Sequence, residues 1–159
     1  MKILVTGANG FIGKNLCARL ECTTEHEILK ITRETPDEQL LKYISECDFI
    51  YHLAGVNRPE DNDYSPNEHC TSGLIGLLEN NNNCVPIVFS SSVLVEQSNH
   101  PYGKSKLLAE MLLREYSKRN NVPVYIYRLS NVFGKWCKPN YNSAVATFCH
   151  NIANDLPIQ

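Results

Sequence analysis

The chain has 159 residues, of which 43% are hydrophobic and 20% are charged, and its formal net charge at pH 7 is −2. This length suits one domain, and the composition excludes disordered, collagen-like and coiled-coil chains. The charge balance argues against a nucleic-acid binder, and because no apolar run is long enough to span a membrane we expect a cytoplasmic protein.

Short apolar runs alternate with segments whose apolar residues recur at helical spacing, which predicts a regular succession of strands and helices. Strands are expected over residues 2–6, 28–32, 49–53, 85–90 and 124–128. Helices are expected with apolar faces at Ile12, Leu16 and Leu20, at Leu40, Leu41 and Ile44, at Leu74, Leu77 and Leu78 within 67–80, and at Leu108, Met111, Leu112 and Tyr116 within 102–119, with a last helix over 142–154. This order predicts a doubly wound α/β domain with a parallel sheet over residues 1–159.

A glycine-rich turn follows the first expected strand directly, with the sequence Thr-Gly-Ala-Asn-Gly-Phe-Ile-Gly over 6–13. Gly7 permits a tight turn at the strand end, and Gly10 lets backbone N–H groups approach a pyrophosphate at the helix start. Gly13 allows the helix to pack closely on the strand. The position of the motif between a strand and a helix predicts a dinucleotide-binding site of the Rossmann type.

The end of the second strand indicates which dinucleotide binds. A carboxylate there would bind the ribose 2′-hydroxyl of NAD, but this chain has Thr32 and Arg33. An arginine suits a 2′-phosphate, so NADP(H) is favoured over NAD(H). The alternative is that Arg33 is a solvated loop residue, and Glu34 beside it would weaken phosphate binding.

A tyrosine and a lysine open the expected helix 102–119 one turn apart. Tyr102 and Lys106 lie at positions i and i+4, so both side chains can face one cleft. An ammonium group close to a phenol favours phenolate, which makes the pair a tunable proton donor or acceptor. Three serines at 90–92 end the preceding strand, where a hydroxyl could bind a substrate carbonyl. Alone, the pair also fits a helix-start tyrosine beside a solvated lysine.

These segments together resemble the extended short-chain dehydrogenase/reductase family. The family pattern combines the glycine turn, an H-x-A-G-like strand end, a Ser/Thr strand end, Y-x-x-x-K and a Y-R-x-x-N-V-Y-G segment. The matching segments are 6–13, 52–55, 90–92, 102–106 and 127–134. The resemblance covers nearly the whole chain in the right order.

The resemblance implies a role for each matched residue. Tyr102 would be the catalytic acid/base, Lys106 would lower its pKa and hold the nicotinamide ribose, and Ser92 would orient the substrate carbonyl, with Ser91 as the fallback. The other cofactor-binding residues would be Gly7, Gly10, Phe11, Ile12, Gly13, Leu53, Ala54 and Gly55. Asn131 would contact a sugar nucleotide.

Two longer strings, over 52–60 and 133–143, are similar to one group within this family. That group makes capsular polysaccharide precursors and reduces a UDP-linked 4-keto-6-deoxy-2-acetamido-sugar with NADPH. The resemblance implies this reaction, a UDP-sugar as the partner, and a homodimeric full-length parent. Arg58, Lys135 and Lys138 suit the phosphates of the substrate, and a solvated basic loop is the alternative.

The chain departs from the family in two ways. Full-length members continue into the rest of a substrate lobe and a cupin domain with a metal-dependent site, so we expect this chain to be a truncated relative with little turnover alone. Val93 and Leu94 follow Ser92 where dehydratases place Asp-Glu, so dehydration lacks its acid and base. The remaining alternatives are a sugar-nucleotide 4-epimerase with bound NAD, and a nucleotide-binding module without turnover.

The seven cysteines are odd in number and scattered, with no Cys-x-x-Cys pair. They predict neither a metal site nor a disulfide framework. We expect reduced thiols that serve as small apolar residues. His52 is expected to be structural, and the other four histidines to lie at the surface or at helix caps.

Overall fold

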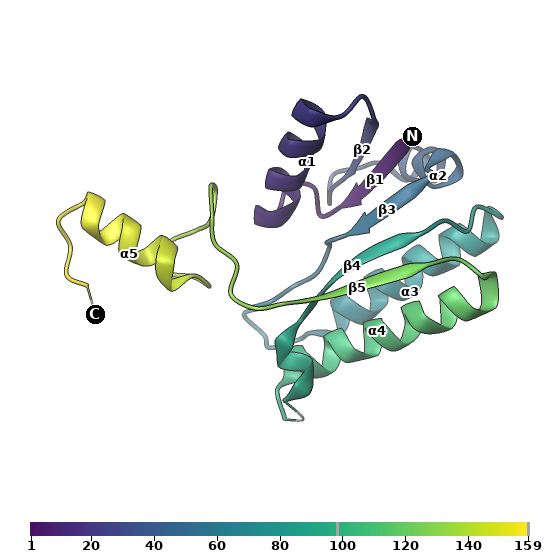
Figure 1. Cartoon of the computed structure of the whole chain (residues 1–159). Coiled ribbons are helices and arrows are strands. Elements are labelled where there is room, and N and C mark those ends of the chain that lie inside the picture. The colour runs from purple at the N-terminus through teal and green to yellow at the C-terminus, as the bar shows by residue number, and fades with distance from the viewer. Residues whose placement is uncertain (98, 159) are drawn as a thin grey trace.

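A computed structural model describes residues 1–97 and 99–158 of the chain. In these residues one parallel sheet is formed, with strand order β2-β1-β3-β4-β5 (Figure 1). The strands are β1 Lys2–Thr6, β2 Glu27–Ile31, β3 Phe49–His52, β4 Ile87–Ser92 and β5 Val124–Leu129. The order along the sheet departs from the order along the chain between β1 and β3, as a doubly wound sheet requires.

The helices cover both faces of the sheet, which confirms the expected α/β class. They are α1 Phe11–Thr23, α2 Asp37–Glu46, α3 Ser65–Asn80, α4 Pro101–Asn120 and α5 Ala144–Ala153, with a 3₁₀ turn η1 at Val93–Glu96. Figure 1 shows α3 and α4 side by side under the sheet and α1 above it. No helix among the described residues has the length and apolarity needed to cross a membrane.

The larger core lies between the sheet and the helices α2, α3 and α4. Leu4, Ile50 and Ile87 are fully buried on this face of the sheet, and Leu113 and Tyr116 of α4 pack against them. Burying each such side chain contributes about 1.5–3 kcal/mol relative to exposure. A smaller cluster under α1 consists of Ile3, Val5, Ala8 and Cys17. The two clusters hold the strand ends, and hence the loops after them, in fixed positions.

The observed β4 starts and ends two residues later than expected. Pro86 has no N–H for the ladder, so pairing with β5 begins at Ile87 and Val124. At the other end Ser92 still pairs with Leu129. All three serines at 90–92 therefore belong to a strand, and consecutive hydroxyls leave it on opposite faces.

The apolar face expected for α4 is shifted from the buried one. Leu108 and Met111 are 45% and 52% exposed, whereas Ala109 and Leu113 are fully buried. The buried face of α4 also contains the polar residues Lys106 and Glu110. The pattern of apolar residues in the sequence therefore did not identify this face. Leu41 of α2, also expected in a core face, is 45% exposed.

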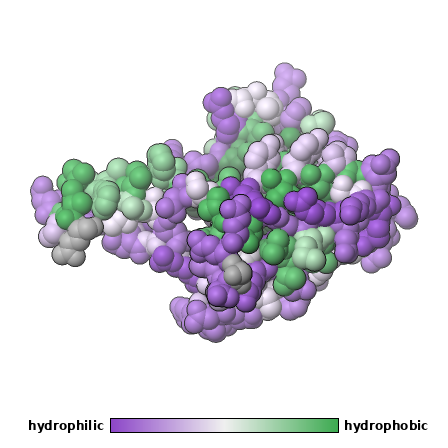
Figure 2. Space-filling view, turned by 60° about the horizontal axis from the view of Figure 1, so that its bottom comes forward, coloured by the Kyte–Doolittle hydropathy of each residue, from purple (hydrophilic) through white to green (hydrophobic). Residues whose placement is uncertain are grey.

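Apolar side chains remain exposed at β5 and α5. Tyr125 and Tyr127, on the face of β5 opposite α4, are 47% and 57% exposed. Figure 2 shows hydrophobic residues on the segment that projects from the sheet, where α5 exposes Phe148 and Ile152. Only some of the cysteines are buried, whereas all were expected to serve as small apolar residues. Cys17 and Cys47 are buried, and Cys22, Cys70 and Cys149 are exposed.

Candidate active site

A cleft of about 1240 Å³ opens at the edge of the sheet where the strands end. Residues at or after each strand end line it: Gly7 for β1, Arg33 for β2, Leu53, Ala54 and Gly55 for β3, Ser92 for β4 and Asn131 for β5. Ligands of doubly wound sheets bind at this edge. The cleft is larger than the roughly 300–1,000 Å³ of common ligand pockets, which leaves room for a dinucleotide and a second ligand.

The glycine turn forms one wall of this cleft and fits a pyrophosphate. Gly7 has φ of 69°, and a Cβ atom there would lie 2.8 Å from the backbone nitrogen of Ala54. Gly10 is the N-cap of α1 and provides no capping side chain, so the first N–H groups of the helix remain available to an anion. Gly7, Gly10, Phe11 and Ile12 line the cleft. Gly13 instead packs against the turn, so closely that a Cβ atom at this position would overlap the Gly7 carbonyl oxygen.

Two basic residues flank the wall formed by α1 and the β2 end. Arg33 lines the cleft as expected, together with Glu34. A hydrogen bond with Thr32, assisted by the charge of Arg33, lowers the pKa of the Glu34 carboxyl, so this group is ionised near neutral pH. Lys14 also lines the cleft and was not anticipated, although its position one turn after Gly10 on the same helix was a readable signal.

The loop after β3 is held by a buried network around Thr6. The Thr6 Oγ1 accepts hydrogen bonds from the backbone N–H groups of Leu53 and Ala54, at 3.2 and 3.1 Å. It donates to Nδ1 of His52 at 2.8 Å, and Nε2 of that ring donates to Thr71 at 3.0 Å. His52 is 1% exposed and has no access to a ligand. The expectation that His52 is structural is therefore confirmed.

The buried imidazole predicts a specific dependence of stability on pH. Burial lowers the pKa of His52 to about 3, so the folded state holds it neutral while the unfolded chain binds a proton below about pH 6.5. Between pH 6 and pH 4 the free energy of unfolding of the wild type should therefore decrease as the pH falls. The decrease should be steeper than that of His52→Gln by about 1.4 kcal/mol per pH unit. Urea denaturation of both proteins at several pH values measures this difference. If the free energy of unfolding of the two proteins changed equally with pH, the prediction would be contradicted.

The expected catalytic pair begins α4. His100 caps this helix, its Nδ1 accepting from the Gly103 N–H at 3.3 Å, and Tyr102 lines the cleft beside it. Lys106 is 4% exposed, and its Nζ donates to the Ser90 carbonyl oxygen at 3.1 Å. The same Nζ lies 4.7 Å from the centroid of the Phe89 ring and 5.9 Å from that of Tyr102. The amine is thus held against the residues of β4 and lies within 6 Å of the Tyr102 ring centroid.

The protonation of this pair differs from expectation. Burial raises the pKa of the Tyr102 phenol, with a further contribution from Tyr64, whose ring is 5.8 Å away. Burial lowers the pKa of Lys106 to about 8. The prediction that Lys106 lowers the pKa of Tyr102 is therefore wrong in this structure. Its Nζ is held by the Ser90 carbonyl rather than close to the phenolic oxygen, and both groups are desolvated.

The three serines have separate roles. All three serines line the cleft, but the Ser91 hydroxyl donates to Glu110 at 2.6 Å in a buried contact, which occupies its hydrogen. Ser92 lines the cleft, and its Oγ accepts from the Leu94 N–H at 3.2 Å, which leaves the hydroxyl hydrogen available. The Ser90 carbonyl binds Lys106. Ser92 remains the candidate for a substrate carbonyl.

The expected substrate-binding residues separate into two groups. Asn131 and Arg58 line the cleft, and the Arg58 guanidinium lies 5.6 Å from the centroid of the Tyr141 ring. Lys135 is not among the lining residues; its Nζ lies over the Trp136 ring at 4.6 Å. Lys138 lines the cleft in its place. The lining of the cleft therefore includes the positive charges of Arg58 and Lys138.

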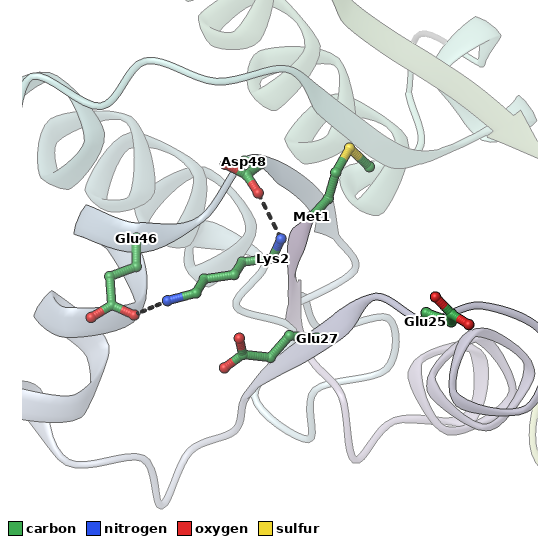
Figure 3. Close-up of a pocket in the computed structure, with 6 residues that line it drawn as sticks. All are labelled: Met1, Lys2, Glu25, Glu27, Glu46 and Asp48. Atoms are coloured by element: carbon green, nitrogen blue, oxygen red, sulfur yellow. Dashed lines mark hydrogen bonds and ion pairs between the residues drawn. The ribbon is translucent and has the colours of Figure 1, made fainter.

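A second hollow lies at the opposite edge of the sheet, where the strands begin (Figure 3). Its lining residues are Met1, Lys2, Glu25, Glu27, Glu46 and Asp48. The Lys2 Nζ pairs with Glu46 at 2.5 Å, and the Lys2 backbone N–H donates to Asp48 at 2.7 Å. Its net negative charge does not suit an anionic nucleotide. Among the described residues no group of three His, Cys, Asp or Glu side chains is arranged to hold a metal ion.

Comparison with known proteins identifies a family and two similar proteins. A sequence model described as "NAD dependent epimerase/dehydratase family" matches residues 3–159. The UDP-2-acetamido-2,6-beta-L-arabino-hexul-4-ose reductase of Pseudomonas aeruginosa is 50% identical over 161 residues, covering 100% of this chain and 43% of the reductase. The solved capsular polysaccharide assembling protein CapF from Staphylococcus aureus is 46% identical with a TM-score of 0.85, over 100% of this chain and 43% of that protein. The chain spans less than half the length of both.

A more distant structure shares the fold. The UDP-glucuronic acid 4-epimerase from Bacillus cereus in complex with NAD has a TM-score of 0.82 and 23% identity, over 99% of this chain and 64% of that protein. At this identity the likeness concerns the fold alone. It supports the architecture of the parallel sheet and its helices.

Proposed function

Because the chain belongs to the NAD dependent epimerase/dehydratase family, we propose that it forms the dinucleotide-binding part of an NADPH-dependent oxidoreductase. The substrate proposed is a UDP-linked 4-keto-6-deoxy-amino-sugar used for capsule or surface polysaccharide precursors. The single observation that carries this proposal is the placement of Tyr102 and Ser92 in the same cleft as the glycine turn. The 50% identity to a reductase of a related UDP-sugar supports the choice of substrate.

The residues present fit a dinucleotide. Gly7, Gly10, Phe11 and Ile12 would hold the pyrophosphate, Leu53, Ala54 and Gly55 the inner face, and Lys106 the nicotinamide ribose. When bound, the reduced nicotinamide supplies the hydride. Tyr102 donates its phenolic proton to the carbonyl oxygen of the sugar, and Ser92 orients that oxygen by a hydrogen bond, so that the ketone becomes an alcohol. The raised pKa of Tyr102 keeps the phenol protonated near neutral pH, as a proton donor requires.

Arg33 supports the proposed preference for NADPH. It lines the cleft at the end of β2, where the adenosine ribose of a dinucleotide would bind. We expect Arg33→Ala to weaken NADPH binding by about tenfold or more, since a charge-assisted hydrogen bond is lost, and to leave NADH binding unchanged. Fluorescence titration of this chain with both cofactors measures the effect.

The matched control for this variant is Arg19→Ala. Arg19 is an exposed arginine of α1 that does not line the cleft, so its removal changes the net charge equally. NADPH affinity should be unaffected in it. Equal losses in both variants, or wild-type protein that binds the two cofactors equally, would reject the role of Arg33.

One observation favours the alternative of a 4-epimerase with bound NAD. Glu34 is ionised and lines the cleft next to Arg33, and a carboxylate at this strand end suits a ribose 2′-hydroxyl. This alternative would be supported if the chain bound NAD more tightly than NADPH and if Glu34→Gln lost the binding of NAD.

The remaining aspects of the function are proposals about the whole protein. Reduction is expected to need the part of the substrate lobe that its relatives carry beyond this region, so this chain alone should bind cofactor with little turnover. We propose a cytoplasmic, homodimeric full-length enzyme with a UDP-sugar as its partner.

A further inference from the structure

The single tryptophan of the chain, Trp136, lies in a tight turn of the segment between β5 and α5 (Figure 1). The Cys137 N–H donates to the Gly134 carbonyl oxygen at 3.1 Å, which closes a turn of residues 134–137 with Trp136 in its third position. The φ angle of Trp136 is 66°, whereas that of Lys135 before it is not positive. These angles are those of a type II turn, in which the third residue is normally glycine or asparagine.

A bulky side chain is unfavourable in this backbone conformation, because its Cβ atom crowds the following carbonyl oxygen. Burial in the core does not offset the cost, since Trp136 is 46% exposed. The side chain lines the cleft instead. Strained residues of this kind gather at ligand sites, where the surrounding contacts hold them in place. The conformation of Trp136 therefore indicates a ligand contact rather than a packing role.

Two contacts hold the turn and the indole in place. The Asn15 Nδ2 of α1 donates to the Lys135 carbonyl oxygen at 2.8 Å and to the Phe11 carbonyl oxygen of its own helix at 2.9 Å. The Lys135 Nζ lies 4.6 Å from the centroid of the Trp136 ring, as in a cation–π contact. Lys135 is not among the residues that line the cleft, so its ammonium covers a part of the indole that the cleft does not use. The ring is therefore oriented before any ligand binds.

The charges near the indole suit a nucleotide. Lys138 lies two residues after Trp136 and lines the same cleft, as does Arg58 of the loop after β3. The Arg58 guanidinium lies 5.6 Å from the ring centroid of Tyr141, which belongs to the same segment as Trp136. Guanidinium and ammonium groups bind phosphates, and an aromatic side chain stacks on the flat ring of a base. A nucleoside diphosphate carries both groups.

We propose that Trp136 is an aromatic platform on which the flat ring of a bound nucleotide stacks, with Arg58 and Lys138 binding its diphosphate. This inference rests on the proposed function, because NADPH and a UDP-sugar both carry a heteroaromatic ring near a diphosphate. We expect the ring to be the uracil of the UDP-sugar. The pyrophosphate of the dinucleotide is assigned to the glycine turn, which leaves Arg58 and Lys138 for a second diphosphate.

The first test uses the emission of Trp136, which as the only tryptophan reports on this position alone. UDP and NADP⁺ do not absorb the light that excites tryptophan, so a stacked ring is detected as quenching. We expect saturable quenching by UDP and none by inorganic pyrophosphate, which carries the charges without a ring. Saturable quenching by NADP⁺ instead of UDP would keep the platform and assign it to the cofactor. Nucleotide binding in calorimetry that leaves the emission unchanged for both ligands would overturn the inference.

The second test compares two exposed aromatic residues of the same segment. Trp136→Gly removes the ring and suits the positive φ, so it should weaken UDP binding in calorimetry by about tenfold without lowering the thermal unfolding midpoint. Phe133→Ala is the matched control, because Phe133 is 63% exposed and is not among the residues that line the cleft. It should bind UDP as the wild type does. Trp136→Phe keeps an aromatic face and should restore most of the affinity.

The outcomes separate the platform from the proposed function. Affinities of Trp136→Gly for UDP and NADP⁺ that equal those of Phe133→Ala would overturn the platform, whatever the unfolding midpoint. A wild-type chain that binds UDP with quenching but does not bind NADPH would overturn the proposed oxidoreductase and still support the platform. A chain that binds neither nucleotide would overturn both.

Discussion

In a full-length protein that contains this chain, Tyr102→Phe is expected to reduce keto-sugar reduction by about 10²–10⁴-fold. Phenylalanine retains the ring that packs 5.8 Å from Tyr64 and removes the acidic hydroxyl. NADPH affinity should stay within about twofold, because the glycine turn and the loop after β3 are unchanged. Steady-state kinetics and fluorescence titration on the same preparation measure both quantities.

Ser92→Ala provides the comparison for this variant. It removes a hydrogen bond to the substrate carbonyl rather than the proton donor, so it should cost less than Tyr102→Phe. Retained turnover in Tyr102→Phe would exclude the proposed proton donor. A loss of NADPH binding as large as the loss of turnover would instead indicate that the ring holds the cofactor.

The largest effect on stability is expected from Glu110→Ala, at about 3–5 kcal/mol in the free energy of unfolding. Glu110 is 1% exposed and accepts from Ser91 at 2.6 Å, and from Nε and Nη2 of Arg128 at 3.0 and 2.8 Å. Its removal leaves the Ser91 hydroxyl without its acceptor, and leaves the Arg128 guanidinium with only the contact to Glu96 at 3.4 Å. Urea denaturation monitored by circular dichroism measures the loss.

The pH dependence of this contribution follows from the same contacts. Burial raises the pKa of Glu110, but the hydrogen bonds from Arg128 and Ser91 outweigh it and hold the pKa below its ordinary value. The contribution is therefore present above the unfolded pKa of about 4.3 and is lost as the pH falls below it.

Glu115→Ala is the matched control for Glu110→Ala. Glu115 is a glutamate of the same helix whose side chain is 64% exposed and pairs with Arg119 at 3.9 Å. A solvent-exposed pair of this kind contributes about 0–1 kcal/mol. Equal destabilisation by the two substitutions would show that the buried network around Glu110 is not stabilising.

The parts of the site that the sequence predicted are those made by neighbouring residues. The strand–turn–helix at 6–13 and the helix-start pair Tyr102 and Lys106 depend on backbone geometry within one or two turns. The match of the family model to residues 3–159 confirms the resemblance inferred from these motifs.

The errors concern contacts between distant segments. The pKa of Tyr102 was expected to fall, but Lys106 is drawn to the Ser90 carbonyl, which the sequence does not place. The contact between the Ser91 hydroxyl and Glu110, which lies 19 residues further along the chain, was likewise not predicted.

By itself, the sequence determined the order of strands and helices, the glycine turn, and the spacing of the phenol and the amine, because each arises from local periodicity or from one turn of backbone. Only the tertiary structure decided that the Ser91 hydroxyl binds Glu110, where the amine of Lys106 is bound, and that Arg128 pairs with Glu110. Those outcomes depend on desolvation and hydrogen bonds between residues that lie 16 to 19 positions apart, so no local pattern encodes them.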